Sequence, residues 1–198
     1  GDYMIIRKYN ENDNLGWVRC RVLAFLDSAY FDNVLREKEK YQNPAIELVA
    51  EVNHKIVGLL DLEYELEIGI VGYKTDELTG VIWHLAVLPE YRNQGIATAL
   101  LNEAMKLLTN TNVKIIQAWT RDDKWVIDWY LRRGFILSEE SSYLHVYAED
   151  EECDYICDAK IKNLFVCSSF NHYIGPDKEL IKRTFKRVHT CNLFELNK

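Results

Sequence analysis

The chain has 198 residues, 48% of them hydrophobic and 28% charged, which is enough for one well-buried domain of ordinary globular composition. Its formal net charge of -7 argues against a nucleic-acid partner, because such proteins present lysine and arginine to the phosphate backbone. No apolar run is long enough to span a bilayer and no signal peptide is evident, so we expect no membrane partner and a cytoplasmic location. The five cysteines are odd in number and loosely spaced, which favours reduced thiols over a disulfide framework or a zinc site.

The first 80 residues are predicted to hold a strand, a long helix and a hairpin of two strands, at residues 4–8, 17–40, 45–52 and 56–63. The last turn of this helix, Glu37 to Lys40, alternates in charge and is interpreted as a solvated end. Residues 66–80 contain three glycines, and the pattern leaves open whether they extend the sheet or form a mobile excursion.

The most informative stretch runs from a strand through a turn into a helix. The apolar run Val81 to Leu88 has the length of a strand and ends at Pro89, which cannot donate a hydrogen bond to a sheet. Residues 96–108 follow helical spacing, so the turn that begins at Arg92 lies at a helix N-terminus. Free N–H groups and the helix dipole favour a phosphate there, Gly95 allows its close approach, and Arg92 can offer a forked cation. The turn therefore predicts a site for a di- or triphosphate.

The remaining sequence continues the alternation of strands and helices. Val113 to Trp119 is predicted to be a buried strand, and Asp123 to Arg133 a helix that ends at Gly134. Further on, two strands and one helix are predicted at residues 143–147, 191–196 and 177–188. This order of elements indicates a mixed α/β layer arrangement.

Two motifs in this region strongly resemble the Gcn5-related N-acetyltransferase (GNAT) superfamily. The first is Leu85-Ala86-Val87-Leu88-Pro89 followed by Arg92-x-x-Gly95-x-Ala97, and the second is Asp123-x-x-Val126-x-x-Trp129-Tyr130-x-x-x-Gly134-Phe135. The resemblance covers residues 1–148. It implies the α/β fold of GNAT acyl-CoA N-acyltransferases, a central mixed β-sheet flanked by helices. We expect a single domain over residues 1–198, with residues 149–187 as an insertion.

The resemblance implies acetyl-CoA as the cosubstrate and no metal. In the family the loop amides hold the pyrophosphate of coenzyme A, and the strand before the loop pairs with its pantetheine arm. Asp123 stands where the family usually has asparagine. The residues that this implies for coenzyme A binding are Leu85, Ala86, Val87, Arg92, Asn93, Gln94, Gly95, Ile96, Ala97, Thr98, Asp123, Trp129 and Tyr130.

The resemblance also implies that Tyr130 protonates the departing thiolate, and a phenol can do so at modest cost because its pKa is close to that of a thiol. A protonated amine acceptor must lose a proton before it attacks, and the candidate bases are Asp61, Glu63, Glu65 and His84, with a water wire as the alternative. Strand alternation separates His84 from Trp83, and the pattern leaves open which of them faces the cleft. A backbone N–H near Val87 would stabilise the tetrahedral intermediate, as the resemblance implies.

The leading functional hypothesis is acetyl transfer from acetyl-CoA to a primary amine of a small molecule, by direct attack in a ternary complex. The acidic balance slightly favours a cationic small-molecule acceptor. The alternatives are acetylation of a protein lysine or N-terminus, and a non-catalytic acyl-CoA-binding or sensing module. A homodimer is plausible by analogy with the superfamily.

Overall fold

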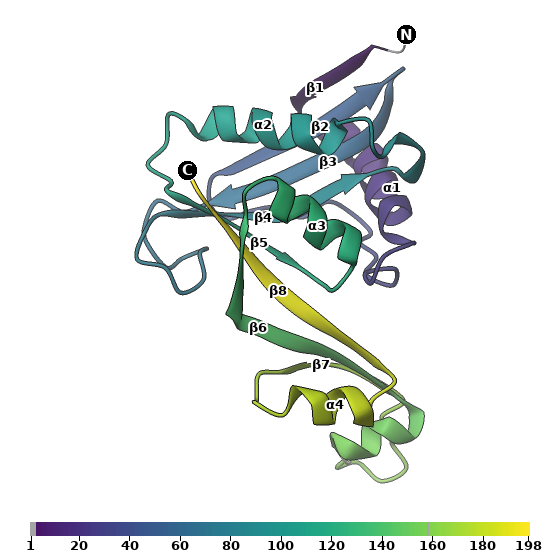
Figure 1. Cartoon of the computed structure of the whole chain (residues 1–198). Coiled ribbons are helices and arrows are strands. Elements are labelled where there is room, and N and C mark those ends of the chain that lie inside the picture. Colours follow the sequence, from purple (N-terminus) through teal and green to yellow (C-terminus); the bar gives the residue numbers. More distant parts are fainter. Residues whose placement is uncertain (1–2, 158) are drawn as a thin grey trace.

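Eight strands form one mixed sheet in the order β1-β2-β3-β4-β5-β8-β6-β7 (Figure 1). The computed structural model describes residues 3–157 and 159–198. The strands are β1 (Met4–Lys8), β2 (Ala45–Val52), β3 (Lys55–Tyr64), β4 (Thr79–Val87), β5 (Ile115–Thr120), β6 (Ile136–Glu149), β7 (Ser168–Tyr173) and β8 (Arg187–Asn197). The helices are α1 (Asn14–Phe25), α2 (Ile96–Leu108), α3 (Lys124–Arg132) and α4 (Lys178–Thr184), with short 3-10 turns η1 (Glu11–Asp13), η2 (Pro89–Tyr91) and η3 (Asp150–Tyr155). The predicted fold class, a mixed sheet flanked by helices, is confirmed.

The two central strands separate part-way along their length. The pair β4 and β5 is parallel, whereas the other neighbouring strands are antiparallel. Pairing runs from Thr79 opposite Ile115 to Ile82 opposite Ala118 and then stops, although β4 continues to Val87. The backbone of the last part of β4 therefore faces an opening in the sheet.

Helices cover both faces of the sheet, and two glycines allow them to pack closely. A Cβ atom at Gly16 of α1 would lie 2.9 Å from the side chain of Ile56, and one at Gly58 of β3 would lie 2.9 Å from Ile96 of α2. A bulge between these two contacts turns Ile56 and Gly58 to opposite faces, because Glu51 pairs with Ile56 while Ala50 pairs with Gly58. The main core consists of the apolar side chains between the sheet and these helices.

The prediction of a long helix over residues 17–40 is wrong beyond Phe25. The helix α1 ends there, and residues 26–44 form turns without a regular element. The reason is tertiary, because the side chains of Arg92 and Asp123 hydrogen-bond the backbone at Ala24 and Ala29 and hold the chain on another path. The solvated end predicted at residues 37–40 is also wrong in part, since Lys38 is buried.

Residues 66–78 contain no strand and leave the sheet as a loop. Both carboxylate oxygens of Glu65 hold this loop, because they accept hydrogen bonds from the backbone N–H groups of Ile70, Val71, Gly72 and Thr79. The loop is therefore an anchored excursion and does not extend the sheet.

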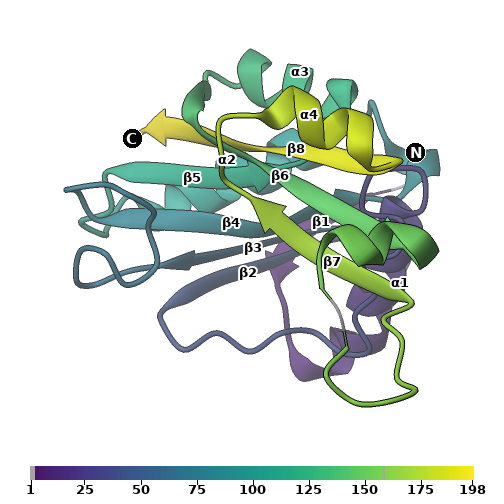
Figure 2. The same cartoon turned by 90° about the horizontal axis from the view of Figure 1, so that it is seen from below.

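The C-terminal part adds β7 and α4 before the chain returns to the sheet (Figure 2). The last strand, β8, enters between β5 and β6, and β7 pairs with the outer edge of β6. A small second core lies here, made of Leu144, Val146, Ala148, Cys153 and Phe185. The helix predicted at residues 177–188 is shorter than expected, and β7 was not predicted. Within the described ranges, no helix is long and apolar enough to cross a membrane.

Candidate active site

A cavity of about 820 Å³ lies where β4 and β5 separate. Its walls come from α1 and the residues after it, the end of β4, the turn before α2, the end of β5, and α3. The residues of both sequence motifs therefore converge on one cavity.

The turn before α2 presents backbone N–H groups at the cavity that make no hydrogen bond within the described part of the chain. Asn93 and Gly95 adopt left-handed backbone angles, with φ of 60° and 81°, and the first backbone bond of the helix is from Ala99 N–H to Gly95 O at 2.9 Å. Apart from Gly95 and its two chain neighbours, no atom of the described residues lies within 4 Å of the position that a Cβ of Gly95 would take. The helix N-terminus is thus open to a ligand, and its dipole favours an anion.

Arg92 takes a different position from the one predicted. Its guanidinium forms a two-point ion pair with Asp27, at 2.6 and 2.9 Å, and also donates to Ala24 O. It lies over the ring of Trp125. This guanidinium lowers the pKa of the Asp27 carboxyl through its hydrogen bonds. Arg92 therefore joins the end of α1 to the turn, while the exposed Arg132 and Arg133 line the cavity as further cations.

The end of β4 turns backbone groups toward the opening. Leu88 N–H donates to Val57 O of β3 at 2.9 Å. The backbone groups of successive residues in a strand point to opposite sides, so the N–H and C=O of Val87 point away from β3. Val87 O accordingly accepts a hydrogen bond from Arg92. The backbone at Val87 is therefore available to a ligand held between β4 and β5.

Tyr130 projects from α3 against Phe194 and Phe135, with ring centroids 5.3 and 5.1 Å away. The residue is 6% exposed and lines the cavity. Burial raises the pKa of its phenol, so the hydroxyl is neutral, and it makes no hydrogen bond to any residue that the structure describes. Trp129 packs edge-on against Tyr130 and also lines the cavity.

His84 sits in a buried network on the α1 side of β4. Its Nδ1 atom accepts a hydrogen bond from Arg21 Nε at 3.1 Å, and its Nε2 atom lies 2.5 Å from Glu39 Oε2. Because the arginine nitrogen always carries hydrogen, the imidazole proton must lie on Nε2 and face Glu39. This bond lowers the pKa of the Glu39 carboxyl. Glu39 is half exposed and lines the cavity.

The structure resolves the question of Trp83 and His84, because both line the cavity. Asp61 pairs with His84 and Leu62 pairs with Ile82, so Trp83 is the extra residue of a bulge that interrupts the alternation.

The other predicted carboxylates are committed to the fold. Glu63 accepts hydrogen bonds from Asn43 N–H, Asn43 Nδ2 and Trp83 Nε1. Glu65 holds the backbone of the 66–78 loop, as described above. Neither lines the cavity, so neither is a candidate base for an amine bound there.

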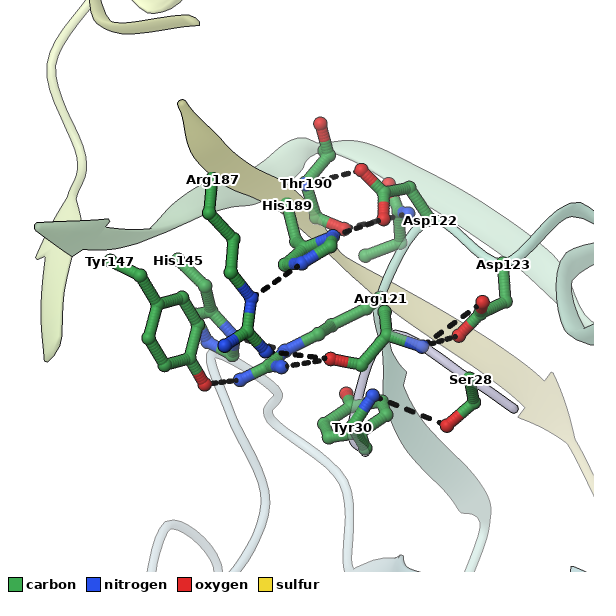
Figure 3. A network of polar contacts seen from close by, with 12 residues as sticks. Ser28, Tyr30, Arg121, Asp122, Asp123, His145, Tyr147, Arg187, His189 and Thr190 are labelled. Atoms are coloured by element: carbon green, nitrogen blue, oxygen red, sulfur yellow. Dashed lines mark hydrogen bonds and ion pairs between the residues drawn. The ribbon is translucent and has the colours of Figure 1, made fainter. Parts of the chain in front are cut away.

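The segment 27–33, which follows α1, forms one wall of the cavity and is held by several side chains (Figure 3). Both oxygens of Asp123 accept a hydrogen bond from Ala29 N–H, at 3.1 and 2.9 Å, so this carboxylate serves the wall. Arg121 is 1% exposed and donates to Ala29 O, His145 Nδ1 and Tyr147 Oη. Arg187 of β8 forms a two-point ion pair with Asp32. The wall is thereby fixed to β8 and to the connection between β5 and α3, where Arg121 and Asp123 lie.

A profile described as the acetyltransferase (GNAT) family matches residues 6–135, well over half of the chain. The protein belongs to this family. The resemblance inferred from the two motifs is thus confirmed, and the chain is a GNAT N-acetyltransferase.

Solved structures of GNAT proteins share the fold along nearly the whole chain. The Escherichia coli ribosomal-protein-S18-alanine N-acetyltransferase has a TM-score of 0.58 at 12% identity, covering 98% of this chain and 94% of that one. Arabidopsis thaliana NAA60, in complex with a bisubstrate analogue, has a TM-score of 0.58 at 16% identity, with 98% of both chains covered. A GNAT family acetyltransferase from Elizabethkingia anophelis with acetyl-CoA bound has a TM-score of 0.53 at 16% identity, with both chains fully covered.

Most residues predicted for the site of this GNAT enzyme line the cavity, and four do not. Gln94 turns its amide back to Glu90 O, and Asp61, Glu63 and Glu65 lie outside the cavity. The sequence interpretation missed Glu39 and Arg21, which place His84. No sequence pattern predicts the role of Glu39, because the residue lies in a segment without regular secondary structure. Among the described residues, no group of three or more His, Cys, Asp or Glu side chains is arranged to hold a metal ion.

Proposed function

We propose that this GNAT enzyme transfers the acetyl group of acetyl-CoA to a primary amine of a small molecule, by direct attack in a ternary complex. The observation that carries the proposal is that one cavity joins an open helix N-terminus, the free backbone of β4 and the His84–Glu39 pair. An acyl donor and an amine acceptor can therefore meet without a covalent enzyme intermediate.

Coenzyme A fits the motif half of the cavity. Its pyrophosphate would accept hydrogen bonds from the N–H groups of the turn at residues 93–98, and its pantetheine arm would follow the free backbone of β4. Arg132 and Arg133 add positive charge at the wall for the remaining phosphate. Gly95 supports this placement, because the space above it is open.

The chemistry follows from this placement. The neutral amine attacks the thioester carbonyl, a C–N bond forms, and the N–H of Val87 stabilises the oxyanion. The intermediate loses a proton from nitrogen to water and then collapses, which breaks the C–S bond and releases the thiolate of coenzyme A. Tyr130 donates its proton to this thiolate and is reprotonated from solvent. Because burial raises its pKa, the phenol is still protonated when the sulfur leaves.

Glu39 is the proton acceptor for the incoming ammonium group in this proposal. One of its oxygens faces the His84 Nε2–H, and the half-exposed carboxylate lines the cavity. His84 cannot accept at Nδ1 as placed, because Arg21 occupies that atom. His84 therefore orients the base, and the carboxylate attracts a cationic acceptor.

The experiment that tests this function measures thiol release from acetyl-CoA with polyamines, aminoglycosides, amino acids, lysine peptides and peptides with free N-termini. Melting temperature is recorded with and without coenzyme A in parallel. We expect a thermal shift and turnover on a small amine. Turnover on peptides alone would move the function to protein acetylation, and a thermal shift without any turnover would support an acyl-CoA-binding module. No thermal shift at all would refute the coenzyme A site.

A further inference from the structure

Lys38 is buried, and its ammonium group lies in a cage of aromatic rings. The distances from Nζ to the ring centroids of Tyr9, Tyr41 and Trp17 are 4.9, 4.8 and 5.6 Å, and its side chain is 3% exposed. Nζ forms an ion pair with Asp61 Oδ2 at 2.9 Å and another with Glu47. Burial removes the ammonium group from water, which costs free energy unless other interactions compensate it. The ion pairs and the aromatic rings supply that compensation here.

The partners of Lys38 stand in a row that leads to His84. Glu47 of β2 pairs with Asp61 of β3, and Asp61 pairs with His84 of β4. Directly opposite residues of an antiparallel pair have neighbouring side chains on one face. The buried Asp61 carboxylate is therefore a close neighbour of the His84 ring, and the rings of Trp17 and His84 form a T-shaped pair with centroids 5.1 Å apart.

Asp61 is fully buried, and one of its oxygens has partners while the other has none. Oδ2 forms an ion pair with Lys38 and accepts a hydrogen bond from Tyr41 Oη, and Oδ1 finds no partner within the described part of the chain. Burial raises the pKa of the Asp61 carboxyl, and the Lys38 ammonium opposes that rise. Lys38 is thus the charge that balances Asp61.

The charge of His84 depends on this balance. The Nδ1 atom accepts from Arg21, so the ring must stay neutral for that bond to exist. Without a cation to balance it, the carboxylate beside the ring would favour the protonated imidazolium form of His84. Both ring nitrogens of that form carry a proton, so Nδ1 could not accept a hydrogen bond from Arg21. The charged and titratable groups that face His84 from the packed elements are Arg21 of α1, Lys38, Glu39 and Tyr41 of the segment after α1, Asp61 of β3 and, beyond it, Glu47 of β2.

We propose that Lys38 is a positioning residue for acetyl transfer: by balancing Asp61, it keeps His84 neutral and its Nε2–H directed at Glu39. This inference rests on the proposed function, in which Glu39 accepts the proton of the amine. Lys38 itself touches neither the acceptor nor coenzyme A, since it lies outside the cavity wall.

The test measures the titration midpoint of the His84 ring by NMR in the full chain, with histidine labelled and the His84 signal assigned by its loss in H84Q. The variants are K38M, D61N and the double variant K38M/D61N. The matched control is K40M, because Lys40 is exposed two residues away. The acid limb of the pH profile of kcat/KM and the melting temperature are recorded for each protein.

We expect D61N to lower the His84 midpoint by roughly one pH unit, because the ring then loses a neighbouring negative charge, and K38M to raise it. The double variant should return to the wild-type midpoint, and K40M should not move it. The pH midpoint of the acid limb of the kcat/KM profile should shift in the same direction as the His84 midpoint in each variant. If K38M fails to fold, D61N and the double variant still carry the test.

Unchanged His84 midpoints in both single variants, with only a lower melting temperature, would overturn the inference and leave Lys38 with a structural role. The NMR midpoints need no acceptor, so they separate the two proposals. Shifted midpoints without acetyl transfer to any amine would support the charge coupling and refute the proposed function. Transfer with unchanged midpoints would refute the coupling alone.

Discussion

The Glu39 carboxylate is the residue on which the proposed chemistry depends most directly. Its removal as a base in E39Q, which keeps the size and a hydrogen-bond acceptor, should lower kcat/KM by about 100-fold at neutral pH, since general-base catalysis contributes at least that much. Coenzyme A affinity should stay unchanged, because the Glu39 side chain contacts His84 and none of the groups proposed to hold coenzyme A. Steady-state kinetics and calorimetric titration measure the two quantities.

The exposed Glu37 provides the matched control for that substitution. E37Q removes a charge two residues away and should leave kcat/KM within about twofold, since exposed charges contribute little. An equal loss of activity in both variants would show that net charge, and not the position of the base, determines the rate.

Tyr130 tests the proton donor at the other end of the reaction. Y130F should lower kcat by about 10- to 100-fold, because the thiolate must then leave without a positioned acid. Stability should change little, since the hydroxyl makes no hydrogen bond within the described part of the chain. Y155F serves as the control, because Tyr155 is 74% exposed. A Y130F variant with wild-type kcat and pH dependence would remove Tyr130 from the mechanism.

His145 predicts how stability depends on pH. Burial, with a contribution from Arg121, lowers the pKa of His145 to about 3, whereas the unfolded ring titrates near 6.5. Between these values the unfolded chain binds the extra proton, so stability falls as pH falls from 6.5 toward 3. At pH 4 the loss from this group is up to about 3 kcal/mol.

The H145Q variant isolates that contribution. Urea unfolding at several pH values should show a smaller decline between pH 6.5 and pH 4 in H145Q than in the wild type, even if H145Q is less stable at neutral pH. Parallel pH dependences of the two proteins would contradict a buried neutral imidazole.

Sequence patterns predict the site only where its residues follow a local motif. Gly95 and Tyr130 belong to motifs of fixed spacing, and both line the cavity. Glu39 and Lys38 stand in a run of alternating charge that is typical of a solvated surface, yet Lys38 is caged and Glu39 meets His84. Their roles depend on pairing with Asp61 and His84, more than 20 positions away, and local spacing holds no information about such contacts.

At the scale of elements, one residue of the turn before α2 meets two requirements, a left-handed backbone conformation and open space for a ligand. Gly95 has φ of 81°, and the space above it is open. G95A should cost about 1 kcal/mol of stability through its left-handed backbone, and its added methyl group should also weaken coenzyme A binding, because it occupies the space that the phosphates would enter. Thermal unfolding and calorimetric titration separate the two effects.

Gly69 supplies the control, because it has φ of 88° with no atom near its Cβ position and lies in the 66–78 loop. G69A should show the strain cost without any change in coenzyme A affinity. A G95A variant that binds coenzyme A as tightly as G69A does would place the phosphates elsewhere.

Elements with an unbroken apolar pattern were predicted well, and those shaped by side-chain clamps were not. The strands β1 and β2 have the predicted bounds, because each carries an apolar pattern of strand length between polar turns. The helix α1 ends early because Arg92 binds the backbone of its last turn at Ala24 and Asp123 binds the backbone just beyond it at Ala29. A periodic pattern predicts that a helix can form, and tertiary hydrogen bonds determine where it stops.

At the scale of the molecule, strand order was the part least accessible to sequence. The final strand β8 enters the middle of the sheet between β5 and β6, and β7 lies at the edge. Both placements depend on pairing over long separations, such as Ala118 with Phe194. The strand β7 mixes serine, histidine and aromatic residues without a clear alternation, so its pattern indicates no strand.

The last prediction concerns the segment between β6 and β8, which we interpret as an insertion. Tyr147 of β6 pairs with Arg187 of β8, so Ala148 and Lys186 can be joined by a two-residue Asn-Gly turn in place of residues 149–185. Leu144 and Val146 lose their cover in this variant, because they belong to the second core, and threonine should replace both.

The shortened variant should fold and keep the thermal shift with coenzyme A, because the cavity is built from α1, β4, β5, α2, α3 and the segments between them. The dissociation constant should stay within about threefold of wild type, since each element named for the donor is retained. An acceptor KM that rises while coenzyme A affinity holds would place the segment in acceptor binding. Loss of the coenzyme A shift in a folded variant would show that residues 149–185 belong to the site and are not an insertion.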